Sequence, residues 1–269
     1  MEKTINRGYE IIDAHTHIYP DKIAAKATEG IGLFYGLSPY HPVASIGGLL
    51  AAGNAHGVSG FLVCSVATSP QQVPGINAFL HEQCARNPSF IGFGAFHPGI
   101  GDPAAEVGRI RALGLHGIKL HPDIQQFDAD APEAYRIYEA AQGALPILMH
   151  MGDARFDHSH PRRLQKVLDD FPKLEVIAAH LGGWSVWGEA LALSRRANVW
   201  FDTSSSLRFL STEEARRQIL AFGAERCFFG TDYPLWDYGD ELDMFFRLGL
   251  PHKDNLGILS QNLKSFLHI

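Results

Sequence analysis

The stretch EIIDAHTHI, residues 10–18, decides the fold, because a hydrophobic strand ends here in two histidines one residue apart. Side chains two residues apart point to the same face of a strand, so the geometry allows His15 and His17 to act as a chelating pair. We expect Ile11 and Asp13 to share this inward face, with Asp13 orienting one imidazole. The spacing alone is weak evidence, since 14 histidines in 269 residues produce roughly 0.7 such pairs by chance.

Seven further strand-like runs follow, each short and mostly apolar, as expected for parallel strands that are buried on both faces. The eight strand candidates are Glu10–Ile18, Ser59–Thr68, Phe90–Pro98, His116–Pro122, Pro146–Gly152, Leu174–Leu181, Val199–Ser204 and Cys227–Tyr233. Amphipathic segments lie between them, several of which begin at Asp, Ser or Pro and end near Gly or Pro. The helix candidates include Val73–Asn87, Asp102–Leu113, Pro132–Gln142, Pro161–Phe171 and Thr212–Phe222.

Eight strand-plus-helix units predict an α/β fold, a single (β/α)8 TIM barrel, which typically needs ~250 residues. Residues 1–269 are therefore expected to form one domain with no large cap domain. The longest irregular connection, from Tyr19 to Ser45, contains several glycines and prolines. We expect it to be a loop, either a lid over the barrel mouth or a passive surface loop.

The composition argues against several classes of partner. A formal charge of -6 and a pI near 6.1 offer no basic surface for nucleic acid or for an anionic membrane. No run approaches the ~18 apolar residues of a membrane span, and the N-terminal segment lacks the apolar core of a signal peptide. Cys64, Cys84 and Cys227 have no paired spacing, which is typical of reduced thiols. We expect a cytoplasmic protein, with a homo-oligomer as an open alternative.

Polar residues end several of the later strand candidates, and the carboxyl ends of barrel strands meet at one rim. His150 ends PILMH, His180 ends EVIAAH and Asp232 ends CFFGTD. Because burying any one of these groups alone is unfavourable, their repetition at matching strand ends indicates a shared site. Lys119, in GIKLHP, is expected to point into the barrel if its two apolar neighbours face the helices. Imidazole and carboxylate groups placed in this way can close around a divalent metal.

These residues resemble the pattern of the amidohydrolase superfamily, specifically the amidohydrolase-related branch that contains small lactonases, hydratases and aromatic-acid decarboxylases. The resemblance covers essentially the whole chain and includes GTDYP at 230–234 and LSQNLKSF at 259–266. It implies that one divalent metal, commonly zinc or manganese, is held by His15, His17, His150 and Asp232. It also implies that His180 acts as a base or polarises the substrate.

Binuclear members of the superfamily add a carboxylated lysine after the fourth strand and use the histidine after the sixth strand as a ligand. By this resemblance Lys119 and His180 are the candidates for a second metal site. The alternative for Lys119 is an ammonium group that pairs with an acidic group. One ion and two ions are both compatible with the sequence.

The ligand set predicts an enzyme that uses metal-activated water on a small-molecule substrate. A divalent ion lowers the pKa of bound water toward ~7, which supplies hydroxide at neutral pH. Asp232 would take the proton, and His180 would stabilise the developing oxyanion or assist the transfer. Because an arginine suits a carboxylate, we expect a carboxylated or lactone substrate. The candidate substrate contacts around the mouth are Arg155, His97, His121 and Trp184.

Three functions follow from this set. The first is hydrolysis of a small lactone, amide or ester, and the second is non-oxidative decarboxylation of an aromatic or enol acid, which uses the same ligands. The third is a catalytically silent metal-binding barrel. The intact Asp232 and His180 argue against the third, because stability alone needs neither residue.

Overall fold

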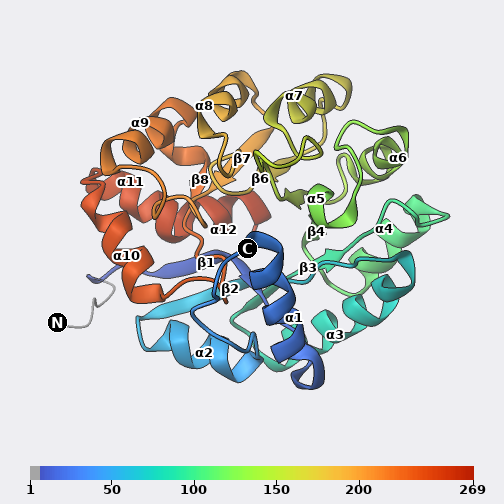
Figure 1. The fold of residues 1–269 in the computed structure, drawn as a ribbon, viewed down its shortest axis with the longest axis horizontal. Coiled ribbons are helices and arrows are strands. Elements are labelled where there is room, and N and C mark those ends of the chain that lie inside the picture. The colour runs from blue at the N-terminus through green and yellow to red at the C-terminus, as the bar shows by residue number, and fades with distance from the viewer. Residues whose placement is uncertain (1–6) are drawn as a thin grey trace.

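Residues 7–269 are described by a computed structural model, in which eight parallel strands pair in the order β1 to β8 (Figure 1). The strands are β1 Ile11–His17, β2 Val58–Cys64, β3 Phe90–Ala95, β4 Gly117–Leu120, β5 Ile147–Met149, β6 Val176–Ala178, β7 Val199–Asp202 and β8 Cys227–Phe228. Ala14 N donates to Phe229 O at 2.8 Å, which joins β1 to the end of β8 and closes the ring. The predicted (β/α)8 TIM barrel is confirmed, while residues 1–6 of the predicted domain lie outside the described residues.

Helices cover the outside of the barrel and connect successive strands (Figure 1). They are α1 Asp21–Tyr35, α2 Ile46–Asn54, α3 Val73–Arg86, α4 Pro103–Ala112, α5 Pro122–Gln125, α6 Pro132–Ala141, α7 Pro161–Asp170, α8 Trp187–Ala190, α9 Thr212–Phe222, α10 Tyr238–Arg247, α11 His252–Leu256 and α12 Asn262–Leu267. The five predicted helices correspond to α3, α4, α6, α7 and α9. Among the described residues no helix is long and apolar enough to cross a membrane.

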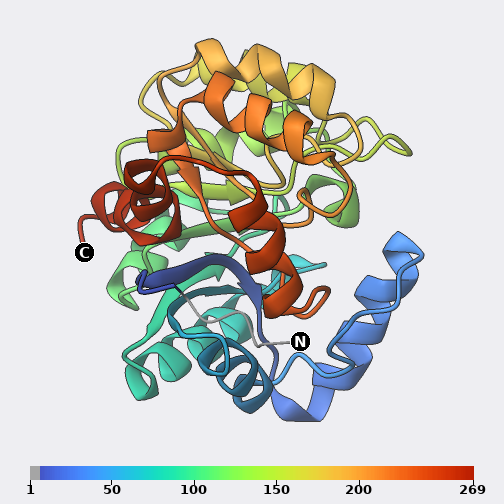
Figure 2. The same ribbon diagram turned by 90° about the vertical axis from the view of Figure 1, so that its left-hand side faces the viewer.

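The connection from Tyr19 to Ser45 is not the irregular loop that its glycines and prolines predict, because it contains the 15-residue helix α1. Thr28 Oγ1 donates to Ala24 O within the helix and accepts from Ala44 N at 2.9 Å, which ties α1 to the returning chain. Gly36, at φ 65°, ends the helix in the left-handed conformation that glycine adopts without strain. Figure 2 shows α1 standing apart from the ring of crossover helices.

An irregularity in β1 determines which of its side chains enter the barrel. Ile12 belongs to the apolar cluster inside the barrel, whereas Ile11 packs with the helices. The expected inward position of Ile11 and Asp13 is therefore wrong. The pairing with β2 shifts between Asp13 and Thr16, as in a β-bulge, and such an extra residue changes the face to which the following side chains point. As a result His15 and His17 face the cavity at the mouth.

The later strands deliver their polar residues by ordinary alternation. Ile118 and Leu120 pack with the helices, so Lys119 between them points into the barrel, as predicted. Leu148 lies in the interior cluster, and His150 shares its parity one residue beyond β5. The far end of the barrel is filled by Leu263 and Phe266 of α12 and their apolar neighbours.

Candidate metal centre

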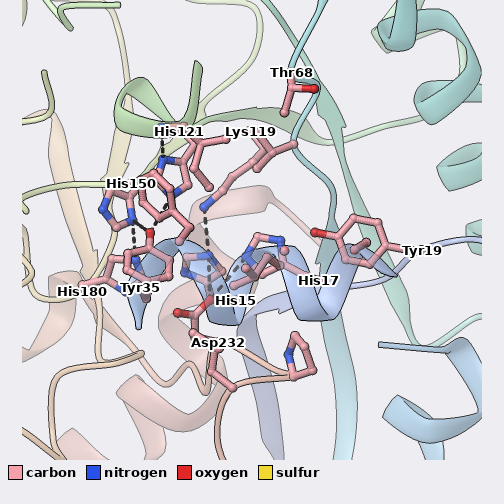
Figure 3. A pocket seen from close by; sticks show the side chains of 18 residues that line it. His15, His17, Tyr19, Tyr35, Thr68, Lys119, His121, His150, His180 and Asp232 are labelled. Atoms are coloured by element: carbon pink, nitrogen blue, oxygen red, sulfur yellow. Dashed lines mark hydrogen bonds and ion pairs between the residues drawn. The ribbon is translucent and has the colours of Figure 1, made fainter. Parts of the chain in front are cut away.

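A cavity of about 310 Å³ opens at the carboxyl ends of the strands (Figure 3). Its polar lining comes from segments far apart in the sequence, which the barrel brings together. These residues are His15, His17, Lys119, His121, His150, His180 and Asp232. The sequence-predicted metal ligands, the proposed second-site pair and one of the four predicted substrate contacts therefore line one cavity.

His15 is fixed from both sides of its ring. Its Nδ1 lies 3.0 Å from Asp202 Oδ2, and because a carboxylate only accepts, the ring proton is on Nδ1. Its Nε2 faces Lys119 Nζ at 2.9 Å and Asp232 Oδ1 at 3.7 Å. Burial, together with Lys119, lowers the pKa of His15 to about 4 against the opposing effect of the two carboxylates. The ring is neutral, so its unprotonated Nε2 can accept from Lys119 or bind a metal.

His17 and Asp232 form the second part of the centre. His17 Nε2 lies 3.3 Å from Asp232 Oδ1, and its Nδ1 lies 3.7 Å from Cys64 Sγ. Burial lowers the pKa of His17, but Cys64 and Asp232 outweigh burial and raise it to about 9. A metal that binds Nε2 must therefore displace a proton from this ring.

Asp232 lies in a tight turn four residues beyond the end of β8, not at the end of a strand as predicted. Its φ is 63°, and its backbone N donates to His15 O at 2.9 Å. Ser205 Oγ donates to Asp232 Oδ2 at 2.6 Å, which leaves Oδ1 toward the two β1 histidines. Burial alone would raise the pKa of Asp232, but His15, His17 and His180 hold it well below its usual range.

The rings of His150 and His180 are in contact, and neither of the two facing nitrogens carries a proton. His150 Nε2 donates to Gly152 O at 2.9 Å, and His180 Nδ1 donates to Ser204 O at 3.1 Å, since a carbonyl oxygen only accepts. Burial lowers the pKa of both rings, so each is neutral. His150 Nδ1 and His180 Nε2 then face one another as two lone pairs 2.9 Å apart. A cation between or beside them relieves this repulsion, so the donor set fits a divalent metal.

The possible ligand atoms gather in more than one group. Sets whose ligand atoms lie within 4.8 Å of one another are His15–His17–Cys64, His15–His180–Asp202 and His121–Asp123–His150. The predicted set combines members of all three groups with Asp232. Among the described residues, none of these groups contains both His150 and a histidine of β1, so the four predicted ligands do not form a single group.

Sequence reasoning missed three residues of the site. Asp202 ends β7 and accepts both from His15 Nδ1 and from His180 N, at 3.0 and 3.1 Å. Its position at the end of a buried apolar run was the available signal. Tyr35, in the segment expected to be a loop, places its hydroxyl 2.7 Å from His121 Nε2. Asp123 is 3% exposed and lies 3.6 Å from His150 Nε2.

The remaining predicted substrate contacts lie differently from His121. Arg155 donates to the buried Asp153 carboxylate at 2.9 and 2.6 Å and to Phe34 O at 2.6 Å, so its guanidinium is already bonded. Trp184 packs edge-on against Tyr35 and borders a smaller adjoining hollow. Among the described residues, neither Arg155 nor His97 lines the main cavity.

A (β/α)8 barrel that gathers histidines, a lysine and an aspartate at its mouth has the architecture of metal-dependent hydrolases and lyases. Residues 12–262 match the sequence model of the family described as Amidohydrolase. The chain belongs to this enzyme family. No curated protein sequence matches the chain.

Several solved structures share the fold at low identity. The 5-carboxyvanillate decarboxylase of Sphingomonas paucimobilis is 18% identical, with a TM-score of 0.76 over 97% of this chain and 100% of the other. A dihydroxybenzoic acid decarboxylase from Polaromonas, which contains manganese and 2-nitroresorcinol, is 17% identical with a TM-score of 0.75 over 97% of each chain. A protein assigned as a 2-pyrone-4,6-dicarboxylic acid hydrolase from Pseudomonas putida is 22% identical, with a TM-score of 0.67 over 96% and 97%. Decarboxylases and hydrolases thus share this fold.

Proposed function

We propose that this protein is a metal-dependent decarboxylase of a small aromatic or enol acid. The observation that carries the proposal is the environment of Lys119. Lys119 is 1% exposed and its side chain faces the cavity. Among residues 7–269 it forms no ion pair with a carboxylate. A buried ammonium without a counter-ion is strongly unfavourable. An anionic group of the substrate would stabilise it.

The position of Lys119 says which part of the substrate carries that charge. Lys119 Nζ lies 2.9 Å from His15 Nε2, a candidate ligand atom. An anion held by Lys119 is therefore at the reaction centre and not at a remote part of the substrate. A carboxylate bound at the reaction centre is the group that reacts, which supports decarboxylation over hydrolysis of a distant ester or lactone bond.

The chain's own residues account for the steps. A divalent ion, zinc or manganese, would neutralise and orient the carboxylate oxygens when bound by His15, His17, His150 and Asp232. Lys119 Nζ donates to the same carboxylate. When the bond to the carboxylate carbon breaks, carbon dioxide leaves and the electron pair remains on the substrate carbon, which gains a proton. Asp232 and His180 line the cavity and can carry that proton.

Hydrolysis of a small lactone, amide or ester is the second candidate, and the same lysine supports it in another chemical form. A carbamate on Lys119 would place oxygen ligands beside His15, and His180 would complete a second metal site. Two metal equivalents and a carbamate mass on Lys119 would favour this reaction. One equivalent and an unmodified lysine favour decarboxylation.

The test uses protein purified without chelator, with metal content measured by elemental analysis. Hydroxybenzoic and enol acids are assayed for carbon dioxide release, and lactones and esters are assayed for consumption of base. We expect carbon dioxide release that is lost in Asp232→Asn with the metal largely retained, and lost in Lys119→Met. His97→Ala, a variant outside the cavity, is the matched control and should retain activity. Base consumption with no carbon dioxide release from any acid would replace decarboxylation by hydrolysis.

The metal itself is tested separately with the His15→Ala/His17→Ala variant. Near one equivalent per chain, lost in this variant, is expected. If the double variant retains its metal, the ion is held elsewhere and the ligand assignment is wrong. If the wild type takes up no metal even after reconstitution, the histidines serve substrate binding or a silent barrel.

A further inference from the structure

One face of α1 forms an apolar wall of the cavity. Ala27, Gly30, Ile31 and Phe34 all line it, and their spacing of three and four residues places them on the same side of the helix. Two of the four are the small residues Ala27 and Gly30. Gly30 is exposed, and a Cβ added there meets no atom within 4 Å, so the wall leaves space at this position where the cavity opens.

The helix is held in place by a neighbouring face. Ala24, Thr28 and Gly32 are buried, and a Cβ at Gly32 would lie 2.8 Å from the ring of Pro39. The bond between Ala44 N and Thr28 Oγ1 joins the helix to the returning chain. That chain is held at the barrel mouth, because Tyr40 N donates to Leu235 O and His41 N donates to Pro234 O, both at 3.0 Å. Its shape is therefore a property of the folded protein and not of a free loop.

The polar groups of the cavity form a cluster that the α1 wall borders at Phe34, whose ring lies edge-on to His121 at 6.1 Å. Figure 3 shows Lys119, Asp232 and the histidines clustered together, with Tyr19 and Thr68 away from them. Beyond this cluster the lining is apolar or uncharged and includes Tyr19, Val66, Ile124, Pro234 and Leu235. Among the described residues, no arginine lines the cavity, because Arg155 is bonded to Asp153 outside it. A second carboxylate on the substrate would lose its hydration without gaining a cation.

We infer that the α1 wall selects a substrate with an uncharged apolar substituent opposite its reacting carboxylate, and that Ala27 and Gly30 determine how large this substituent is. The inference rests on the proposed function, because Lys119 sets the direction in which the acid binds. Burial of one methylene group against such a wall corresponds to about a fourfold gain in affinity. Dicarboxylic acids are disfavoured.

Isothermal titration calorimetry on the zinc-loaded protein tests this inference with simple probes. These are benzoate, 4-ethylbenzoate, terephthalate, and the uncharged methyl esters of the first two acids. We expect 4-ethylbenzoate to bind about 15-fold more tightly than benzoate, from two buried carbons. Terephthalate should bind more weakly than benzoate. Equal affinities for benzoate and 4-ethylbenzoate, or preference for terephthalate, would overturn the inference.

Variants then locate the effect on α1. Gly30→Leu, and independently Ala27→Leu, should bring the 4-ethylbenzoate to benzoate ratio near one while benzoate binding is retained. Gly108→Leu is the matched control, because Gly108 is an exposed mid-helix glycine of α4 that also has open space and does not line the cavity. Circular dichroism and a thermal melt confirm that each variant is folded. An unchanged ratio in both α1 variants assigns the selectivity elsewhere.

The probe set separates this inference from the proposed function. If the ethyl group strengthens binding in acids and esters alike, but acids bind no better than esters, the wall is supported and an acid substrate is not. A second outcome has acids bind better than esters, with this preference lost in Lys119→Met, while the ethyl group adds no affinity. That outcome supports the acid substrate and contradicts the wall. Absence of binding by all probes contradicts both.

Discussion

Glu241 is a carboxylate buried where nothing donates a hydrogen bond to it. It lies in α10, is 0% exposed, and neither carboxylate oxygen has a hydrogen-bond partner. The nearest cation is Arg208, whose Nη2 lies 3.6 Å from Oε1. Burial raises the pKa of Glu241 to about 8, with Arg208 opposing and Asp13 adding to the shift. We predict that Glu241→Gln stabilises the protein at neutral and alkaline pH.

The magnitude follows from the two pKa values. Between the ordinary pKa of 4.5 and the folded-state value of about 8, the folded protein binds more protons at Glu241 than the unfolded chain does. The free energy of unfolding must therefore fall as pH rises through this window, by about 1.4 kcal/mol per pH unit where the slope is full. Glutamine is neutral at every pH and lacks this slope. Between pH 5 and pH 8, the stability advantage of the variant should grow by about 3.5 kcal/mol.

Urea unfolding followed by tryptophan fluorescence, at pH 5 and at pH 8, measures this difference. Glu139→Gln is the matched control, because Glu139 is an exposed glutamate of α6, away from Glu241 and Arg208, and its replacement should show no such growth. The use of a difference between variant and wild type cancels the carboxyl groups that do not interact with Glu241. An advantage of Glu241→Gln that is the same at pH 5 and pH 8 would refute the reasoning.

Three further predictions concern the site. Asp202→Asn should lower metal affinity about 10- to 100-fold, because Asp202 sets the tautomer and orientation of His15. Competition with a chelator measures this affinity, and an unchanged affinity would contradict the role of Asp202. Arg155→Ala should lower the free energy of unfolding by about 1–3 kcal/mol through the carboxylate of Asp153 that it leaves underbonded, measured by urea titration at pH 7. A raised KM for an acid substrate with no loss of stability would instead return Arg155 to substrate binding. Chelator treatment should lower the Tm, and zinc or manganese should restore it, since a ligand of the folded state stabilises that state; an unchanged Tm argues against a resident metal.

The barrel could be predicted from the sequence because its signal is repeated. Each parallel strand must bury both faces, so eight apolar runs in alternation with helices leave few other folds. The same regularity placed Lys119 correctly, since Ile118 and Leu120 are apolar and flank it. Prediction succeeded where a side chain's direction depends on strand alternation alone.

Prediction failed where a local irregularity of the backbone decides the direction of a side chain. The shift in β1 between Asp13 and Thr16 moves Asp13 away from the imidazoles, where it accepts from His15 N and from Thr231. Asp202, a residue on β7, orients His15 instead. No pattern of apolar residues encodes a bulge, because the extra residue interrupts the alternation that the pattern records.

Helix α1 shows a second kind of failure. Glycine and proline favour turns in isolation, and they predicted a loop between Tyr19 and Ser45. In the folded protein Gly32 lies where the chain packs too closely for a Cβ, and Gly30 leaves space in the cavity wall. Tertiary packing therefore outweighs the local preference, and the sequence alone does not reveal the contact.

The barrel closes where β1 meets β8, and this closure determines when during synthesis the candidate metal centre can form. Asp232 N donates to His15 O, so the first and last strands of the ring share the centre. A nascent chain on the ribosome displays His15 and His17 early but lacks the aspartate until most of the protein has been synthesised. The predicted ligand set is complete only after the ends of the barrel have joined. Tight metal uptake would thus report that Asp232 has been synthesised and that the ring has closed, and a chain truncated before Asp232 would lack one predicted ligand.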